Sequence, residues 1–307
     1  MSAKGRLTVL LIAVLTVLSL AGVWKYFQYK NKPPKPVLLY QLSSGSPWGA
    51  LLTPQQTLSY RNRLYISDTG NGRILTFDLN GKFLFEFAKP QGFGKKMPYP
   101  YGIATDDKGN IYVADTETGK IVVYDEHGHF LKNLAEINRY LSNPTGVFIR
   151  GDSIYVSDVK LQQIRVFNSE AKLLMTVGSG KTGKGEQDLF IPNTVIVDSL
   201  GRLYVTDNMN NRIQVFDRDG KYIKTLGSGK GLELINPRGI AIDTRGFIYV
   251  ANTLNKSIKI YNPEGRFLLD FTGNNSFSFG VPSSITVDKN DRIYVTDGSS
   301  VLVFSRT

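Results

Sequence analysis

The chain has 307 residues, no cysteine and only two histidines, so disulfide bonds, thiolate metal sites and cysteine nucleophiles are excluded. Its formal net charge is +11, of which +6 comes from residues 1–35, where six Lys or Arg side chains occur without an acid. The remaining 31 basic and 26 acidic side chains give +5. A dedicated nucleic-acid binder more often carries a concentrated basic stripe, so nucleic acid is not the expected partner.

The amino-terminal segment predicts a membrane anchor. A basic tail over residues 1–6 precedes an 18-residue tract, Leu7 to Trp24, that contains no charged side chain. At about 1.5 Å per residue, a helix of this length just crosses the apolar core of a bilayer. Aromatic residues that favour the membrane boundary follow at once. The alternative is a cleaved signal peptide, for which Ser19 to Ala21 offers small residues, although the apolar tract is long for that role.

Residues 25–36 form a basic, proline-rich linker, in which three prolines favour an extended spacer. Amino-terminal anchors usually leave the amino terminus inside the cell, and large domains translocate largely regardless of flanking charge. We therefore expect a single-pass protein of the cell membrane whose folded part lies outside the cytoplasm. Four lysines follow the span and two basic side chains precede it, a count that favours the opposite orientation.

A phrase of the form Tyr-Ile/Val-x-Asp/Asn recurs six times after the linker. Its aromatic residues are Tyr65, Tyr112, Tyr155, Tyr204, Tyr249 and Tyr294, spaced by 47, 43, 49, 45 and 45 residues. A period of this length is typical of a propeller blade, in which each repeat is a four-stranded unit. The copy from Pro192 to Leu226 contains four β-branched and aromatic runs separated by Asp-x-x-Gly turns and one loop, the expected pattern of four strands.

The two ends of the repeat region complete each other. The sixth copy ends after its third strand, Val301 to Phe304. The segment Pro36 to Leu42 matches the fourth strand, Lys221 to Leu226, in register. We therefore predict that the amino-terminal strand completes the last blade and closes the ring. The predicted fold is an all-β, six-bladed β-propeller over residues 37–307, preceded by one transmembrane helix.

The repeat resembles the NHL repeat in all six copies over residues 36–307. The resemblance rests on patterns such as Pro-Tyr-Gly-Ile-Ala-Thr-Asp at 100–106 and Ile-Tyr-Val-Ala-Asp at 111–115. The resemblance implies a six-bladed propeller. Most propellers of this family serve as recognition platforms for proteins or RNA, or as ectodomains of sensors, and a minority are enzymes. An anchor followed by one such propeller is similar to membrane-anchored proteins of the bacterial envelope.

An acid recurs at the end of the second strand in every copy except the fifth, which has Asn252, and could be mistaken for a catalytic ring. We expect a structural role instead, in which the carboxylate accepts hydrogen bonds from the following turn or pairs with an arginine such as Arg73 or Arg212. The glycine-rich segment 178–185 has the glycine and lysine spacing of a phosphate-binding loop, but Gly185 stands where that motif needs Ser or Thr, and no helix is expected to follow. The innermost strands contain no Asp or Glu, whereas lactonase-type propellers place a metal on such residues. No catalytic residue, metal or cofactor is therefore predicted.

The loops between blades, together with the loops between second and third strands, are the predicted binding surface because they are long and irregular. Residues directly after each blade proline should surround the channel mouth. The candidate binding residues are Gln55, Lys89, Phe93, Lys95, Lys96, Tyr99, Tyr101, Thr145, Lys181, Asn193, Lys230, Arg238 and Ser283. Aromatic and basic side chains together suit protein hot spots or anionic polymers. Solvated loops without a partner are the alternative interpretation.

The sequence thus predicts a membrane-tethered, non-enzymatic recognition or scaffold propeller that binds a protein or a cell-envelope partner. A first alternative is a lactonase-like hydrolase of the envelope. A second is an RNA-binding propeller, which requires a cytoplasmic domain. The oligomeric state does not follow from the sequence.

Overall fold

The computed structural model describes residues 32, 34–45, 47–87, 99–229, 231–274 and 277–306. Residues 36–307 form one compact unit. The predicted tail and anchor, and most of the predicted linker, lie outside the described residues. Within the described ranges, no helix has the length and apolar character needed to span a membrane.

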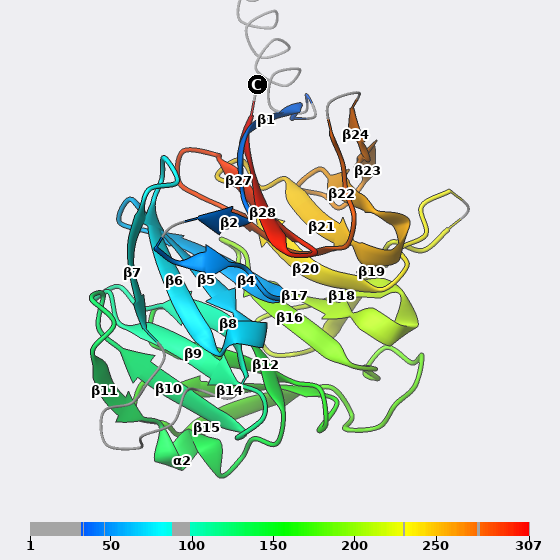
Figure 1. The fold of residues 1–307 in the computed structure, drawn as a ribbon. Helices are drawn as coiled ribbons and strands as arrows, with labels where there is room; N and C mark the ends of the chain where they lie inside the picture. Colours follow the sequence, from blue (N-terminus) through cyan, green and yellow to red (C-terminus); the bar gives the residue numbers. More distant parts are fainter. Residues whose placement is uncertain are drawn as a thin grey trace, which may run out of the picture. The chain divides into compact units, whose positions relative to one another are not determined.

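Six four-stranded antiparallel sheets form the ring, as predicted (Figure 1). Blade 1 contains β4 (Pro54–Tyr60), β5 (Arg63–Asp68), β6 (Arg73–Asp78) and β7 (Phe83–Phe87). Blade 2 contains β8 (Pro100–Thr105), β9 (Ile111–Asp115), β10 (Lys120–Tyr124) and β11 (Phe130–Asn133). Blade 3 contains β12 (Pro144–Arg150), β13 (Ser153–Asp158), β14 (Gln163–Asn168) and β15 (Leu173–Val177).

Blade 4 contains β16 (Pro192–Val197), β17 (Leu203–Asp207), β18 (Arg212–Phe216) and β19 (Tyr222–Leu226). Blade 5 contains β20 (Pro237–Ile242), β21 (Ile248–Asn252), β22 (Ser257–Tyr261) and β23 (Phe267–Phe271). Blade 6 contains β26 (Pro282–Val287), β27 (Ile293–Asp297), β28 (Ser300–Arg306) and β1 (Pro36–Leu42).

Several short elements lie in the connections between the main strands. They are β2 (Ser44–Gly45), β3 (Gly49–Ala50), β24 (Gly273–Asn274), β25 (Phe277–Ser278), the helix α2 (Ala135–Asn138) and the 3₁₀ turns η1 (Thr69–Asn71), η2 (Asn208–Asn210) and η3 (Thr253–Asn255). The innermost strands β4, β8, β12, β16, β20 and β26 contact one another in that order, and β26 contacts β4. The ring is therefore continuous.

The amino-terminal strand closes the ring, which confirms the prediction from the truncated last repeat. In Figure 1 the first strand, β1, lies beside the last, β28. Leu38 pairs with Phe304 and Leu42 pairs with Val301. Because β1 supplies the fourth strand, blade 6 has the same number of strands as the other blades.

The ring has two distinct faces. The loop face carries the connections between blades and between second and third strands. The turn face carries the tight turns between first and second strands and between third and fourth strands. Asp198 illustrates such a turn: its carboxylate accepts hydrogen bonds from the backbone N–H groups of Leu200 and Arg202, each at 2.9 Å. Gly201 adopts φ of 81°, a left-handed conformation that glycine adopts without strain.

Side chains between adjacent blades form the hydrophobic core. Between blades 5 and 6, for example, Tyr249, Ile258, Phe279 and Phe304 are all buried in one cluster. Five of the six repeat tyrosines are buried, and Tyr155 is half-buried. Burying an aromatic or aliphatic side chain of this size contributes about 1.5–3 kcal/mol. The phrase recurs once per blade because each blade needs one such anchor.

Candidate functional site

The recurring acid is a structural element, as predicted, and Asn252 takes its place in blade 5. In blade 4, the Asp207 carboxylate accepts hydrogen bonds from the Phe190 backbone N–H at 2.6 Å and from Arg212 Nε at 2.7 Å. In blade 1, Asp68 is bonded in the same way to Leu52 N–H and to Arg73 Nε, each at 2.7 Å. Each acid thus ties an incoming loop to its blade.

Two of the residues that follow the blade prolines are bonded to each other at the channel mouth on the loop face, and the charge of a third acts on one of them. The Asn193 side chain of blade 4 donates a hydrogen bond to the Tyr101 hydroxyl of blade 2 at 3.0 Å, so the contact spans the position of blade 3. The charge of Arg238, from blade 5, acts on the same hydroxyl. We call Tyr101, Asn193 and Arg238 the mouth cluster.

Burial raises the pKa of Tyr101 above its usual value of about 10, and the Asn193 hydrogen bond and the Arg238 charge only partly oppose this effect. The hydroxyl is therefore neutral at physiological pH. Tyr99 lies beside it, with 38% of its surface exposed and ring centroids 6.4 Å apart. The mouth cluster together with Tyr99 presents one cation, one amide and two phenol rings.

The other residues that follow the blade prolines form hydrogen bonds to nearby residues of the ring. Thr145 is only 4% exposed, and its hydroxyl donates to the Asn193 carbonyl at 3.0 Å. Ser283 bonds to Thr296 at 2.8 Å. Gln55 Nε2 donates to the Thr53 carbonyl at 3.4 Å, while its Oε1 is buried without a hydrogen bond. The structure therefore does not bring all six predicted residues together as a polar ring.

The predicted lysines and Phe93 are mostly outside the described part of the chain. Lys89, Phe93, Lys95, Lys96 and Lys230 all fall there. Lys181 is exposed in the loop between blades 3 and 4. That loop is organised by Asp188, which accepts hydrogen bonds from Ser179 and from the Gly185 backbone N–H, and these bonds lower the Asp188 pKa. As predicted, the glycine-rich segment is a between-blade loop with no following helix.

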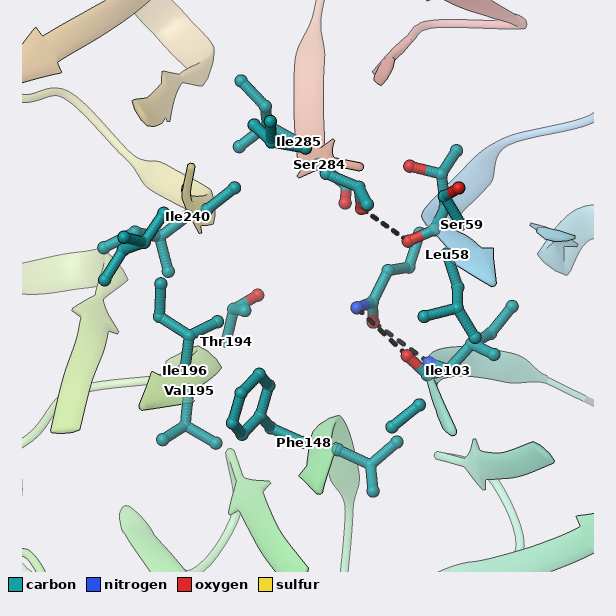
Figure 2. Close-up of a pocket in the computed structure, with 18 of the residues that line it drawn as sticks. Leu58, Ser59, Ile103, Phe148, Thr194, Val195, Ile196, Ile240, Ser284 and Ile285 are labelled. Carbon is teal, nitrogen blue, oxygen red and sulfur yellow. Dashed lines mark hydrogen bonds between the residues drawn. The ribbon is translucent and has the colours of Figure 1, made fainter. Parts of the chain in front are cut away.

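Below the mouth, the six inner strands enclose a cavity of about 290 Å³ (Figure 2). Its wall includes Leu58, Ile103, Phe148, Ile196 and Ile285. None of the described side chains that line it is charged. The repeat pattern of the sequence indicates which strands are innermost. It does not indicate that the side chains of these strands leave a cavity between them.

Titratable groups are dispersed over the described part of the chain. There, no three His, Asp or Glu side chains lie in an arrangement that could hold a metal ion. The histidines lie in the turn between β10 and β11, where His129 Nδ1 is 2.9 Å from Asp125 Oδ2. This bond lowers the pKa of Asp125. Both imidazoles are exposed on the turn face, apart from the mouth cluster.

Two family models match the sequence. Residues 97–124 match the NHL repeat, and residues 190–298 match a family described as a 6-bladed beta-propeller. The chain is a six-bladed β-propeller with an NHL repeat. A comparison with curated proteins finds no match.

Solved structures extend the similarity over most of this propeller. A streptogramin B lyase is 14% identical, with a TM-score of 0.60 over 90% of this chain and 98% of that chain. A putative gluconolactonase is 13% identical, with a TM-score of 0.65 over 89% and 92%. A Bacteroides thetaiotaomicron protein of unknown function is 13% identical, with a TM-score of 0.66 over 90% and 73%. At such low identity the similarity shows the fold alone.

Proposed function

We propose that this protein is a membrane-tethered recognition propeller that binds a protein or cell-envelope partner through its loop face, outside the cytoplasm. The observation that supports this function is the mouth cluster. Tyr101 and Asn193 are hydrogen-bonded to each other from two different blades where the channel opens on the loop face, and the charge of Arg238 from a third blade acts on the Tyr101 hydroxyl. A site that draws on several blades is asymmetric, unlike the acid, which recurs in five of the six blades.

The chemistry of the mouth suits a polar or anionic group of a partner. Arg238, whose Nε donates to Asn236 Oδ1 at 3.1 Å, supplies a guanidinium that can pair with a carboxylate or a phosphate, and Tyr99 supplies a partly exposed ring beside that of Tyr101. Arginine and tyrosine are enriched among the residues that dominate binding energy at protein interfaces. An acidic peptide segment or an acidic envelope polymer is the class of partner that this combination favours.

The entry point of the chain supports the proposed arrangement. β1 begins at Pro36, which pairs with Arg306 at the turn-face end of β28. A chain anchored through residues 7–24 would join the ring on the turn face. The loop face lies at the other end of the channel and would remain available to a partner.

Site-directed photocrosslinking in the protein's own membrane tests this function. A photoreactive residue is placed at Tyr99 of the full chain, and a matched one at Ser169, an exposed residue of the turn face. We expect a defined partner to crosslink from the Tyr99 position and not from the Ser169 position. Arg238→Ala should reduce that crosslinking about tenfold, the loss expected for an interface hot spot of ~1.4 kcal/mol. Equal crosslinking from both positions contradicts the proposal.

The two alternatives have their own tests. Metal-dependent hydrolysis of lactones or esters by purified residues 31–307 would replace the recognition function with an enzymatic one. Protection of the propeller from protease added to intact cells would place it in the cytoplasm, where RNA binding becomes the leading candidate.

A further inference from the structure

The cavity in the channel is a separate feature from the mouth cluster. Its lining comes from the later residues of each inner strand, including Ile103–Thr105 of β8, Val147–Ile149 of β12 and Ile240–Ile242 of β20. Inner strands begin at the loop face and end at the turn face, so the cavity lies toward the turn face. The Tyr101–Asn193 hydrogen bond joins blades 2 and 4 on the loop-face side of it.

Three of the polar side chains in the lining are paired within the ring, whereas Thr57 Oγ1 is buried without a hydrogen bond. Gln56 accepts a hydrogen bond from the Ile103 backbone N–H at 3.1 Å and donates to the Ile103 carbonyl at 3.4 Å. Thr194 donates to the Arg238 carbonyl at 2.9 Å, and Thr286 donates to the Thr57 carbonyl at 2.6 Å. These groups connect neighbouring blades, and Figure 2 shows two of these contacts at the cavity wall. Since they do not depend on water, an apolar guest would leave them paired.

The rest of the wall is mostly aliphatic and aromatic, with the hydroxyl side chains of Thr57, Ser59, Thr105 and Ser284 among the apolar ones. Leu58, Phe148, Ile196, Ile242 and Val287 all line the cavity and are only partly buried by the protein itself. Their exposed apolar surface faces a space that an apolar molecule could fill, which would remove that surface from water. A charged ligand would find no charged partner among the described lining residues.

The volume sets the size of the ligand. An engineered apolar cavity of about 150 Å³ in another protein binds benzene. Small-molecule sites generally begin at about 300 Å³ and are mostly apolar. At about 290 Å³ this cavity is close to that limit and nearly twice the size of the benzene site. We propose that the turn-face half of the channel is a binding site for a small, uncharged, apolar molecule of bicyclic aromatic size. This inference does not depend on the proposed loop-face function.

Binding of the bicyclic fluorescent probe 1-naphthylamine, whose aromatic amine is uncharged at neutral pH, tests the site. Residues 36–307 contain every strand of the six sheets and all six hydrophobic clusters, so a fragment of residues 31–307 contains the whole folded ring and avoids the apolar segment 7–24. We expect saturable binding with a stoichiometry of one, together with a higher thermal unfolding midpoint at saturating probe.

Ser59→Phe and Ser169→Phe form a matched pair of variants. Ser59 lines the cavity, whereas Ser169 is exposed in the turn between β14 and β15. Filling the cavity with the Ser59→Phe ring should weaken probe binding at least tenfold, and Ser169→Phe should leave it unchanged. A linear, unsaturable signal, or equal affinity in both folded variants, overturns the proposal.

Phe148→Ala provides a second test that does not require an additional ring to fit. Phe148 lines the cavity and contacts the Tyr155 ring, with centroids 6.3 Å apart. Its removal enlarges the cavity, so the affinity for the probe should change at least threefold in either direction. Tyr99→Ala on the loop face should leave the affinity unchanged. An unchanged affinity in Phe148→Ala, or a loss in Tyr99→Ala, contradicts a site in the turn-face half of the channel.

Discussion

Arg306 of blade 6 forms an ion pair with Asp243 of blade 5, with Nη1 and Oδ2 2.5 Å apart. The Arg306 side chain is 5% exposed and that of Asp243 is fully buried. A second carboxylate, that of Asp291, lies 3.0 Å from the same nitrogen. The residue that ends β28 therefore fixes the closing blade to its neighbour.

Removal of this arginine should destabilise the ring. In Arg306→Ala, Asp243 loses its cation but stays buried beside the Tyr249 hydroxyl, which donates to it at 2.9 Å. Breaking a buried ion pair by removing one partner typically costs about 3–5 kcal/mol. Urea unfolding of residues 31–307 measures this loss. The control is Arg266→Ala, an exposed arginine of the β22–β23 turn, which should change stability by less than about 0.5 kcal/mol. Similar stability in the two variants would contradict the locking role of Arg306.

Deletion of residues 36–42 tests closure of the ring by β1. The truncated chain loses the partner of β28 and exposes an unpaired edge. It also loses Leu42, which is buried in the cluster that contains Tyr294 and Val303. We expect a much lower urea midpoint and aggregation in size-exclusion chromatography. The fragment 31–307, which retains β1, is the control, and equal stability of the two fragments would refute the closure argument.

Asp207 substitutions separate a structural from a catalytic role. Asp207→Ala removes the acceptor of Phe190 N–H and Arg212 Nε, so buried donors lose their partners at a cost of about 1–3 kcal/mol each. Asp207→Asn should cost less, because Asn252 accepts the equivalent bond from Ile235 N–H at 2.6 Å in blade 5. Thermal and urea unfolding measure both variants. A catalytic role would be indicated if either variant abolished an activity without any change in stability.

Buried tyrosines predict unfolding at alkaline pH. Burial, followed by the charge of a nearby carboxylate, raises the pKa of Tyr112 to about 12, and burial likewise raises that of Tyr204 to about 12. An unfolded tyrosine ionises near pH 10, so the folded state retains its proton over this interval. The stability that these side chains contribute is complete below about pH 10 and is lost as the pH rises toward about 12.

A pH series of urea unfolding, with tyrosinate absorbance followed in parallel, checks this expectation. In Tyr204→Phe the pH dependence should be shallower than in the unmodified protein, since one shifted group is absent. A free energy of unfolding that increases between pH 10 and pH 12 would contradict this expectation, because a raised tyrosine pKa predicts a decrease.

The amino-acid sequence determined the repeat, the strands and the closure of the ring. These features follow from short-range patterns: alternating apolar residues form strands, Asp-x-x-Gly forms turns, and Pro36 to Leu42 supplies the strand that the last copy lacks. The Asp207–Arg212 pair was also predictable, because the two residues are five apart and lie at the ends of adjacent strands.

Only the tertiary structure decided which residues meet across the ring. Tyr101 and Asn193 are 92 residues apart, and Arg306 and Asp243 are 63 apart. Their contacts depend on how the blades are placed around the channel, which no local period encodes. The position of Thr145 was also decided by the placement of the blades, because its hydroxyl donates to the Asn193 carbonyl of the next blade. The channel cavity has this origin too, because its shape results from how the side chains of six strands fill their common axis.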